Sequence, residues 1–342
     1  MTKVDVIIPS KNKGWVYPLI IWRDKFKERN IEINIKDNTK DYLSSKPDVV
    51  IITSRYYSDH NTISEDLLLN DVDNYKGVGS KVIFYDLSAA SGSKMLHLIK
   101  YVDLFLKRQI FKDKDIYKNG FYGKQQYRIW SKKENLNLDS CSEEEQKKIK
   151  IGWNLGYRDF STPLFVLFNR SFKPFWRETK YKSPNRPKPI TCSFRGSLNT
   201  GHGGQRTKGV EILKSLDNSR FITGPKLNKK DFYKEMSDSK VVFSPFGHGE
   251  ICYRDIEAFV HGAILIKPDI SHIETFPNLF IENKTYLPCS WDLSDLEELL
   301  TDIDRNYKNY QDIAIQGQDI FKKISNDFDL FYNHFFKIIE NV

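Results

Sequence analysis

Short apolar segments alternate with longer amphipathic ones along most of the chain. In the first half, apolar residues dominate several short runs, as in parallel strands that are covered on both faces. These runs span 4–8, 31–35, 48–53, 81–85 and 102–106. Residues 15–29 have the apolar spacing of a helix and predict a crossover after the first strand. The first half is therefore predicted to form an open α/β sheet.

The same alternation restarts after residue 189. Apolar runs predict strands at 190–194, 220–223, 240–244 and 263–266, with a further short strand near 285–289. Helices are predicted at 206–217, 229–238 and 251–261. The tail from Ser294 to Val342 has helical spacing throughout.

Two polar stretches separate these regions. Residues 107–150 are polar, aromatic and basic and predict an insertion, whereas the prolines and lysines of 173–189 are typical of an interdomain linker. We predict an α/β protein of two Rossmann-like, doubly wound domains, 1–175 and 176–325, with a helix at 326–342 that packs back on the first domain. Such a fold places a cleft between the carboxyl edges of the two sheets, where ligands bind.

Composition restricts the partners but does not select one. The chain has 342 residues, a net charge of +8 and a pI near 9.0, which favours phosphates, nucleotides, acidic glycans, an anionic membrane surface or nucleic acid. Its four cysteines are far apart and form no CxxC pair, so we expect neither a disulfide framework nor a zinc site. The N-terminal sequence lacks the order of a signal peptide, and no apolar run approaches the roughly 18 residues of a membrane span. We expect a cytoplasmic protein and leave open peripheral contact with the inner face of a membrane.

The basic aromatic segment 107–133 has three interpretations. It could bind an acidic or lipid-linked acceptor, touch an anionic membrane surface, or form a solvated face over packed tyrosines. The sequence leaves all three open.

The stretch SPFGHGEICYRDIEAFVHGAILIKPD, residues 244–269, predicts a binding site. A strand ends in a glycine turn that enters a helix, whose free N–H groups and positive dipole end favour phosphate. Arg254 lies in the first turn and can fork onto a diphosphate. Glu257 follows on the same face, where a carboxylate suits a pair of sugar hydroxyls. The alternative is an Arg–Glu pair on a solvated helix face.

A second glycine turn, SFRGSLNTGHGGQRTKGVEIL at 193–213, leaves a strand at Arg195 and brings Arg206 and Lys208 to a helix. It matches neither the P-loop nor the GxGxxG pattern, so it is either a second anion-binding turn or a flexible basic loop. TGP at 223–225 is a third turn after a strand. The predicted donor-binding residues are Arg195, Gly196, Arg206, Lys208, Gly224, Pro225, Gly247, His248, Gly249, Glu250, Arg254, Glu257 and Lys267.

The C-terminal half resembles the nucleotide-sugar domain of GT-B glycosyltransferases, and within them the exostosin-like branch. The resemblance rests on the strand, the glycine turn, the R-x-x-E-A of Arg254, Glu257 and Ala258, and the strand that follows, and covers roughly residues 190–280. It implies that Arg254 meets the donor diphosphate and Glu257 the ribose. The N-terminal half fits as the acceptor-side domain by architecture alone.

One departure bears on the mechanism. Many retaining GT-B enzymes carry two glutamates separated by seven residues, and the first would fall on Gly249, whereas the acid here is Glu250. We therefore expect an inverting enzyme, which needs a general base. Asp86, directly after a strand, is the candidate base, although it could equally be a helix cap or a turn residue. His60 and Asp159 are the runners-up.

No cluster has metal-ligand spacing, and the acidic DVD at 71–73 lies away from any strand end, so we expect no tightly bound cofactor and no metal requirement. The leading hypothesis is a glycosyltransferase of polysaccharide, lipopolysaccharide or similar glycan assembly that moves a sugar from a nucleotide-sugar to a glycan or lipid-linked acceptor. The alternatives are a nucleotide-sugar epimerase or phosphorylase of the same architecture, and a basic nucleic-acid-binding protein, which the absence of a recognisable module disfavours.

Overall fold

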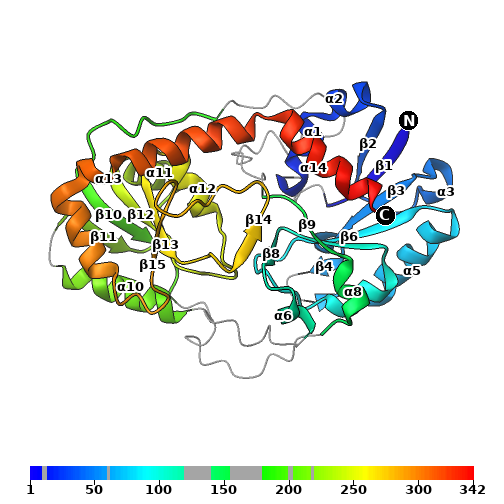
Figure 1. The fold of residues 1–342 in the computed structure, drawn as a ribbon, viewed down its shortest axis with the longest axis horizontal. Coiled ribbons are helices and arrows are strands. Elements are labelled where there is room, and N and C mark those ends of the chain that lie inside the picture. The colour runs from blue at the N-terminus through cyan, green and yellow to red at the C-terminus, as the bar shows by residue number, and fades with distance from the viewer. Residues whose placement is uncertain (10–13, 60–61, 119–139, 155–178, 199–202, 217–218) are drawn as a thin grey trace.

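The computed structural model describes residues 1–9, 14–59, 62–118, 140–154, 179–198, 203–216 and 219–342. The chain forms two lobes, each built around one parallel sheet with helices on its faces (Figure 1). This confirms the predicted fold class of two Rossmann-like α/β domains.

The first lobe holds a six-stranded parallel sheet in the order β2-β1-β3-β6-β7-β9. Its strands are β1 (Thr2–Ile7), β2 (Ile31–Lys36), β3 (Val49–Thr53), β6 (Lys81–Asp86), β7 (Leu104–Lys107) and β9 (Ile149–Ile151). Its helices are α1 (Tyr17–Ile21), α2 (Arg23–Glu28), α3 (Tyr42–Ser45), α4 (Ser54–Tyr57), α5 (Glu65–Gly77), the 3-10 helix η2 (Leu96–Tyr101), α6 (Asp115–Lys118) and α8 (Glu143–Lys147). A small hairpin pairs β4 (Ser58–Asp59) with β5 (Thr62–Ile63).

The second lobe holds a five-stranded parallel sheet in the order β11-β10-β12-β13-β15. Its strands are β10 (Ile190–Arg195), β11 (Phe221–Gly224), β12 (Ser239–Phe243), β13 (Ile264–Pro268) and β15 (Leu287–Cys289). Its helices are α10 (Gly203–Ser215), α11 (Lys229–Asp238), α12 (Tyr253–Val260) and α13 (Leu296–Ser325).

Burial explains why the apolar runs become strands. Every residue of β3 and of β13 is buried, which is the environment of a parallel strand with helices on both faces. The predicted crossover at 15–29 is split into α1 and α2, which meet at Trp22. The predicted strands and helices of the second lobe occur within a few residues of their expected bounds.

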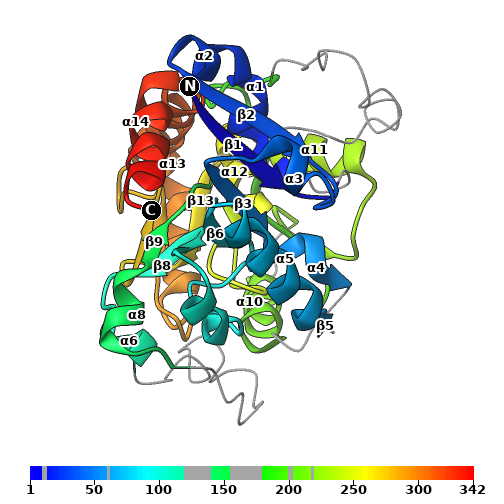
Figure 2. The same ribbon diagram turned by 90° about the vertical axis from the view of Figure 1, so that its right-hand side faces the viewer.

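The chain crosses back to the first lobe at its end. After α13, Asp327 caps α14 (Phe328–Glu340) by accepting a hydrogen bond from the Leu330 amide. The rings of Phe331 and Phe335 are fully buried against Phe26, at centroid separations of 6.2 and 5.3 Å. In Figure 2, which looks onto the first lobe, α14 (red) lies beside the helices and sheet of that lobe.

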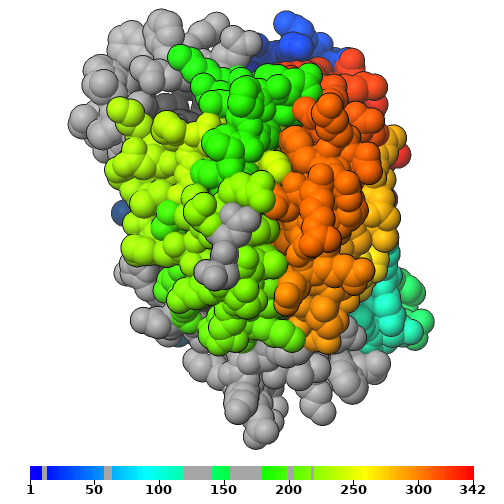
Figure 3. All heavy atoms as spheres, turned by 90° about the vertical axis from the view of Figure 1, so that its left-hand side faces the viewer, coloured from blue at the N-terminus to red at the C-terminus, as the bar shows by residue number. Residues whose placement is uncertain are grey.

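One further segment joins the two lobes, and another packs along α13. The part of 107–150 that the structure describes supplies the edge strand β9, the helices α6 and α8, and β8 (Gln109–Phe111). Strand β8 pairs in antiparallel register with β14 (Ile273–Thr275) of the second lobe. The proline-rich segment before β10 lies along α13, where the Gln318 amide donates to the Lys182 carbonyl at 2.8 Å (Figure 3).

Candidate functional site

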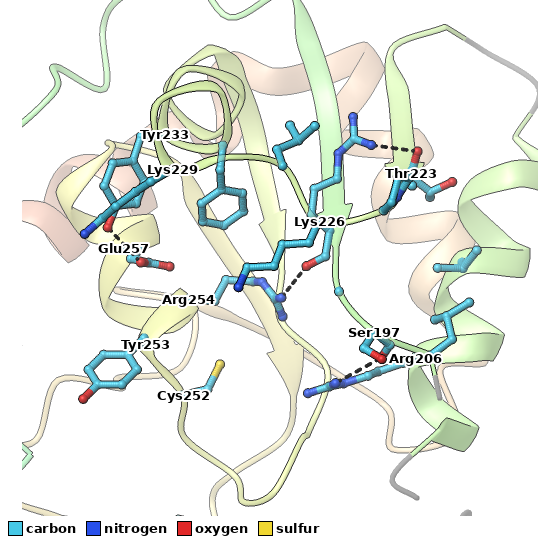
Figure 4. A pocket seen from close by; sticks show the side chains of 18 of the residues that line it. Ser197, Arg206, Thr223, Lys226, Lys229, Tyr233, Cys252, Tyr253, Arg254 and Glu257 are labelled. Atoms are coloured by element: carbon cyan, nitrogen blue, oxygen red, sulfur yellow. Dashed lines mark hydrogen bonds between the residues drawn. The ribbon is translucent and has the colours of Figure 1, made fainter. Parts of the chain in front are cut away.

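A pocket of about 1160 Å³ opens at the carboxyl edge of the second sheet (Figure 4). Its walls come from the ends of β10 and β11, from the start of α12, and from one face each of α10 and α11. This is the edge at which open α/β sheets bind ligands, and the volume suits a small molecule.

Two arginines, Arg254 and Arg206, line this pocket. Arg254, in the first turn of α12, donates from Nη2 to the Arg195 carbonyl at 2.6 Å, and its guanidinium lies 4.9 Å from the centre of the Phe194 ring. Arg206 of α10 donates from Nη1 to the Ser197 carbonyl at 3.2 Å. Burial lowers the pKa of Arg206, and the nearby charge of Arg254 lowers it further. Two cations that repel each other in a half-buried site favour an anionic ligand between them.

Arg254 retains unused hydrogen-bonding capacity. Its Nε is buried, and no described residue accepts a hydrogen bond from it. No carboxylate of the described residues forms an ion pair with Arg254 either. The side chain can therefore bind a phosphate without first losing a protein partner.

Glu257 lies on the opposite side of Arg254 from Arg206 (Figure 4). Its Oε1 accepts a hydrogen bond from the Tyr233 hydroxyl at 3.2 Å. Burial raises the pKa of Glu257, although the hydrogen bond from Tyr233 and the charge of Arg254 act against that rise. The pocket thus offers cations for a phosphate and, further along α12, a carboxylate that can accept from hydroxyl groups.

Arg195 lines the pocket but is already paired. Its guanidinium forms an ion pair with Glu235, with Nη2 and Oε2 2.6 Å apart, and Nη1 donates to the Thr223 carbonyl at 3.3 Å. A β-carbon on Gly224 would overlap Nη1, so the glycine is needed for this arginine to lie against the end of β11. Arg195 therefore forms part of the pocket wall, and its charge is already balanced by Glu235.

The predicted donor residues fall into two groups. Those that line the pocket are Arg195, Gly196, Arg206, Gly224, Pro225, Arg254 and Glu257. Lys208, Gly247, His248, Gly249, Glu250 and Lys267 do not line it. Gly247 still serves it, because a β-carbon there would overlap the guanidinium of Arg206.

Glu250 and Lys267 have a different environment from the one we predicted. Glu250 is 2% exposed, and its carboxylate accepts hydrogen bonds from the amide and the hydroxyl of Ser91 in the first lobe, at 3.0 and 2.6 Å. Lys267 is fully buried and donates to the Glu250 carbonyl and to Asp255 Oδ2, both at 2.6 Å. Glu250 contacts the first lobe, Lys267 holds the turn that carries Glu250, and neither residue lines the donor pocket.

Asp86 is not open to an acceptor. It is fully buried, and its Oδ2 lies 2.8 Å from Nζ of the equally buried Lys107. Burial raises the pKa of Asp86, but the charge and hydrogen bond of Lys107, with bonds from Ser93 and Ser88, bring it below its ordinary value. An occupied, inaccessible carboxylate cannot take a proton from a bound sugar, which corrects our expectation for Asp86. His60 and Asp159, the runners-up, lie outside the described residues.

Part of the pocket was not predicted from the sequence. Tyr233 and Lys229 stand one turn apart on α11, with the Lys229 ammonium 5.4 Å from the Tyr233 ring centre, and Lys226 reaches in from the turn after β11. The spacing of Lys229 and Tyr233 on a predicted helix, directly after the TGP turn, was the available indication.

Two further observations concern the residues that the structure describes. Within them, no three His, Cys, Asp or Glu side chains gather closely enough to hold a metal ion. In the same part of the chain, no helix combines the length and apolar character needed to cross a bilayer.

Comparison with known proteins identifies the fold. No protein-family model and no curated protein sequence matches the chain. Among solved structures it is similar to HepE of Anabaena in complex with UDP and glucose, with a TM-score of 0.52, 10% identity and full coverage of both chains. A second HepE structure, with UDP-glucose, has a TM-score of 0.49 over the full length of both chains at 10% identity. A glycosyltransferase from Rickettsia africae has a TM-score of 0.48 at 11% identity, over 99% of this chain and 98% of that one.

These features define the class of architecture. Two facing parallel-sheet lobes, a pocket at the carboxyl edge of the second sheet and a terminal helix that returns to the first lobe make up the GT-B fold. The chain has that fold.

Proposed function

We propose that this protein is a glycosyltransferase that binds a nucleotide-sugar in the pocket of the second lobe and transfers the sugar to a glycan or lipid-linked acceptor. The observation that carries the proposal is the meeting of Arg206 and Arg254 beside the N-terminus of α12. A helix N-terminus and two guanidinium groups form a binding site suited to a diphosphate. The similarity to HepE, solved with UDP and glucose, makes UDP the first nucleotide to test.

In this proposal the residues have distinct roles. Arg206 and Arg254 bind the diphosphate and stabilise the charge that develops on it as the bond to the anomeric carbon breaks. Glu257, steadied by the Tyr233 hydroxyl, accepts hydrogen bonds from the ribose hydroxyls. We further propose that the arginines balance the diphosphate charge in place of a metal ion.

We infer an inverting reaction. The acceptor oxygen forms its bond to the anomeric carbon from the face opposite the leaving diphosphate, and its proton passes to a base. The inference is supported by Glu250, whose carboxylate is bound to Ser91 and does not line the pocket. A second glutamate beside Glu257, as in the retaining pattern, is therefore not supplied from this turn. The exostosin-like relationship and a role in polysaccharide assembly remain part of the proposal.

Thermal unfolding in the presence of nucleotides tests the proposal. UDP, GDP, dTDP, ADP and CMP should be compared, each with and without manganese. A nucleotide present at 100 times its dissociation constant adds about 2.7 kcal/mol of stability. We expect one diphosphate to stand out and manganese to add nothing; no shift with any nucleotide would contradict the donor site.

Product analysis separates a transferase from an epimerase of similar shape. The transferase needs an acceptor and releases a nucleoside diphosphate with the sugar joined to that acceptor. An epimerase would change the sugar of the nucleotide-sugar with no acceptor present, and such a product would overturn the proposal.

A further inference from the structure

Arg108 is a buried cation at the carboxyl edge of the first sheet. It follows β7 directly, on the edge that faces the second lobe, and only 9% of its surface is exposed. Burial lowers its pKa, and the charge of Arg55, which follows β3 on the same edge, lowers it further. A buried charge is costly unless it is paired, so its partners decide what the residue is for.

The protein holds the guanidinium of Arg108 in place without neutralising it. Nε donates to Asn154 Oδ1 at 3.1 Å, and Asn154 donates in turn to the Arg108 carbonyl at 2.8 Å. The guanidinium carbon lies 4.2 Å from the centre of the Trp15 ring, and the Trp15 carbonyl accepts from Trp153 Nε1 at 3.0 Å. One edge and one face of the guanidinium are therefore fixed.

The rest of the guanidinium has no partner among the described residues. None of them accepts a hydrogen bond from Nη1 or Nη2, and none of their carboxylates lies within 4.0 Å of Arg108. Arg195 shows the contrasting case in the same chain, because Glu235 neutralises it and Thr223 occupies its outer nitrogen. A structural arginine is expected to resemble Arg195, whereas Arg108 is oriented but left uncompensated.

The position of Arg108 connects it to the donor pocket. Trp15, which holds it, contacts Tyr253 of the second lobe at a ring separation of 5.3 Å, and Tyr253 lines the pocket. Burial raises the pKa of Tyr253, and the charges of Arg108 and Arg55 both act against that rise. The nearby acids are already engaged, since Asp86 is paired with Lys107 and Glu250 with Ser91. Arg108 therefore remains an uncompensated positive charge, and Trp15 connects it to Tyr253 of the donor pocket.

We propose that Arg108, held by Trp15 and Asn154, forms an anion subsite between the lobes. The subsite would bind a carboxylate or phosphate group of the sugar substrate, and we assign that group to the acceptor. The proposal rests on the proposed function and names its substrate class: an acidic or phosphorylated saccharide. The two free Nη groups present parallel N–H bonds, which match the paired oxygens of both anions. Arg55 adds a second positive charge near Arg108.

Binding to the full-length protein tests this subsite. Glucuronate, glucose and inorganic phosphate are titrated with and without saturating UDP. Glucuronate is expected to bind about tenfold or more tightly than glucose, since hydrogen bonds to a charged group contribute about 1.5–3 kcal/mol. Arg108→Gln should abolish that preference. Arg108→Lys should keep only part of it, because an ammonium cannot form the two parallel hydrogen bonds of a guanidinium.

Arg29→Gln is the matched control. Arg29 also stacks on an aromatic ring, 4.4 Å from the centre of Tyr332, but it lies between α2 and α14, away from the cleft. Its loss should leave the preference for glucuronate unchanged. Unfolding curves of all variants establish that they fold; if Arg108→Gln does not, Arg108→Lys carries the test.

A comparison of UDP-glucuronate with UDP-glucose shows whether the anionic group belongs to the donor or to the acceptor. If UDP-glucuronate is preferred over UDP-glucose through Arg108 while free glucuronate and phosphate are not bound, the subsite serves the donor sugar and the assignment to the acceptor is wrong. The subsite itself is overturned if neither acids nor phosphate are preferred, or if the preference survives Arg108→Gln. Failure of UDP to bind would count against the proposed function alone, because the phosphate and glucuronate titrations without UDP still test Arg108.

Discussion

The carboxylate of Glu250 in the second lobe accepts two hydrogen bonds from Ser91 in the first, one from the amide at 3.0 Å and one from the hydroxyl at 2.6 Å. The two residues are 159 positions apart in the chain. Lys267 stabilises the same turn by donating a hydrogen bond to the Glu250 carbonyl. The glycine turn after β12 therefore has two functions: one side shapes the donor pocket and the other fastens the lobes together.

The contact predicts that Glu250→Gln affects stability and leaves the donor site intact. An amide can accept only one of the two hydrogen bonds, so the free energy of unfolding should fall by about 1–3 kcal/mol. Affinity for the nucleoside diphosphate should stay within about twofold, because Glu250 does not line the pocket. Urea unfolding and nucleotide titration measure the two quantities, and a large loss of affinity with unchanged stability would return Glu250 to the donor site.

Gly249 gives a second test of the same contact. A β-carbon there would overlap the carbonyl of Ala89 in the first lobe, and backbone atoms cannot move aside cheaply. Gly249→Ala should lower the free energy of unfolding by about 1–3 kcal/mol, the usual cost of overpacking.

Gly77→Ala is the control for this substitution, because a β-carbon at Gly77 meets no atom within 4 Å. It should leave stability unchanged or raise it slightly. Equal stability of the two variants in urea would show that the turn does not press against the first lobe.

The fold could be predicted because its signals are local. Runs such as 49–53 and 263–266 are apolar at nearly every position, as expected of short parallel strands that are covered on both faces. Arg254 and Arg206 could be assigned for the same reason: each follows a strand and a glycine turn at the start of a helix, and that pattern alone places a cation at a sheet edge.

The roles of other site residues depend on partners far away in the chain. Asp86 was a reasonable base until the register of β6 and β7 set it beside Lys107, which no local pattern reveals. Glu250 and Glu257 belong to one motif, yet the carboxylate of Glu250 accepts hydrogen bonds from Ser91 and Gln109, which are far away in the chain. Arg108 was hidden in a basic stretch, and its neighbour Lys107 is the one that is neutralised.

A buried histidine packs against Tyr233 of the pocket, with ring centres 4.7 Å apart, and its titration should be visible in stability. Burial lowers the pKa of His261 from 6.5 to about 4, and the charges of Lys182, Lys188 and Arg186 add to this effect. Between these pH values the unfolded chain binds a proton that the folded protein does not, so stability is lost as pH falls below 6.5. The free energy of unfolding should drop by about 2 kcal/mol from this residue between about pH 7 and about pH 5.

His261→Asn isolates this contribution, since it keeps a polar group near the Ser237 hydroxyl, 2.7 Å from Nδ1, and cannot titrate. Its stability should depend less on pH than that of the wild type by the same amount. Identical pH profiles for the two proteins in urea unfolding would show that His261 is not held neutral.

The ribose role of Glu257 can be tested with paired ligands. Glu257→Gln should weaken UDP binding by about tenfold, because a charged acceptor is replaced by a neutral one. Binding of 2′,3′-dideoxy-UDP should be nearly the same for both proteins, since that ligand has no hydroxyls for Glu257. If the substitution weakens both ligands equally, Glu257 acts on the shape of the pocket and not on the ribose.

The central claim concerns the diphosphate site, and calorimetric titration of Arg254→Gln tests it most directly. The nucleoside diphosphate that stabilises the wild type most is titrated into the wild type, Arg254→Gln and the control Arg220→Gln, whose residue precedes β11 at the opposite edge of the same sheet. The account predicts a loss of affinity of about tenfold to a hundredfold for Arg254→Gln and a change within about twofold for Arg220→Gln. Equal affinity of Arg254→Gln and the wild type would contradict it.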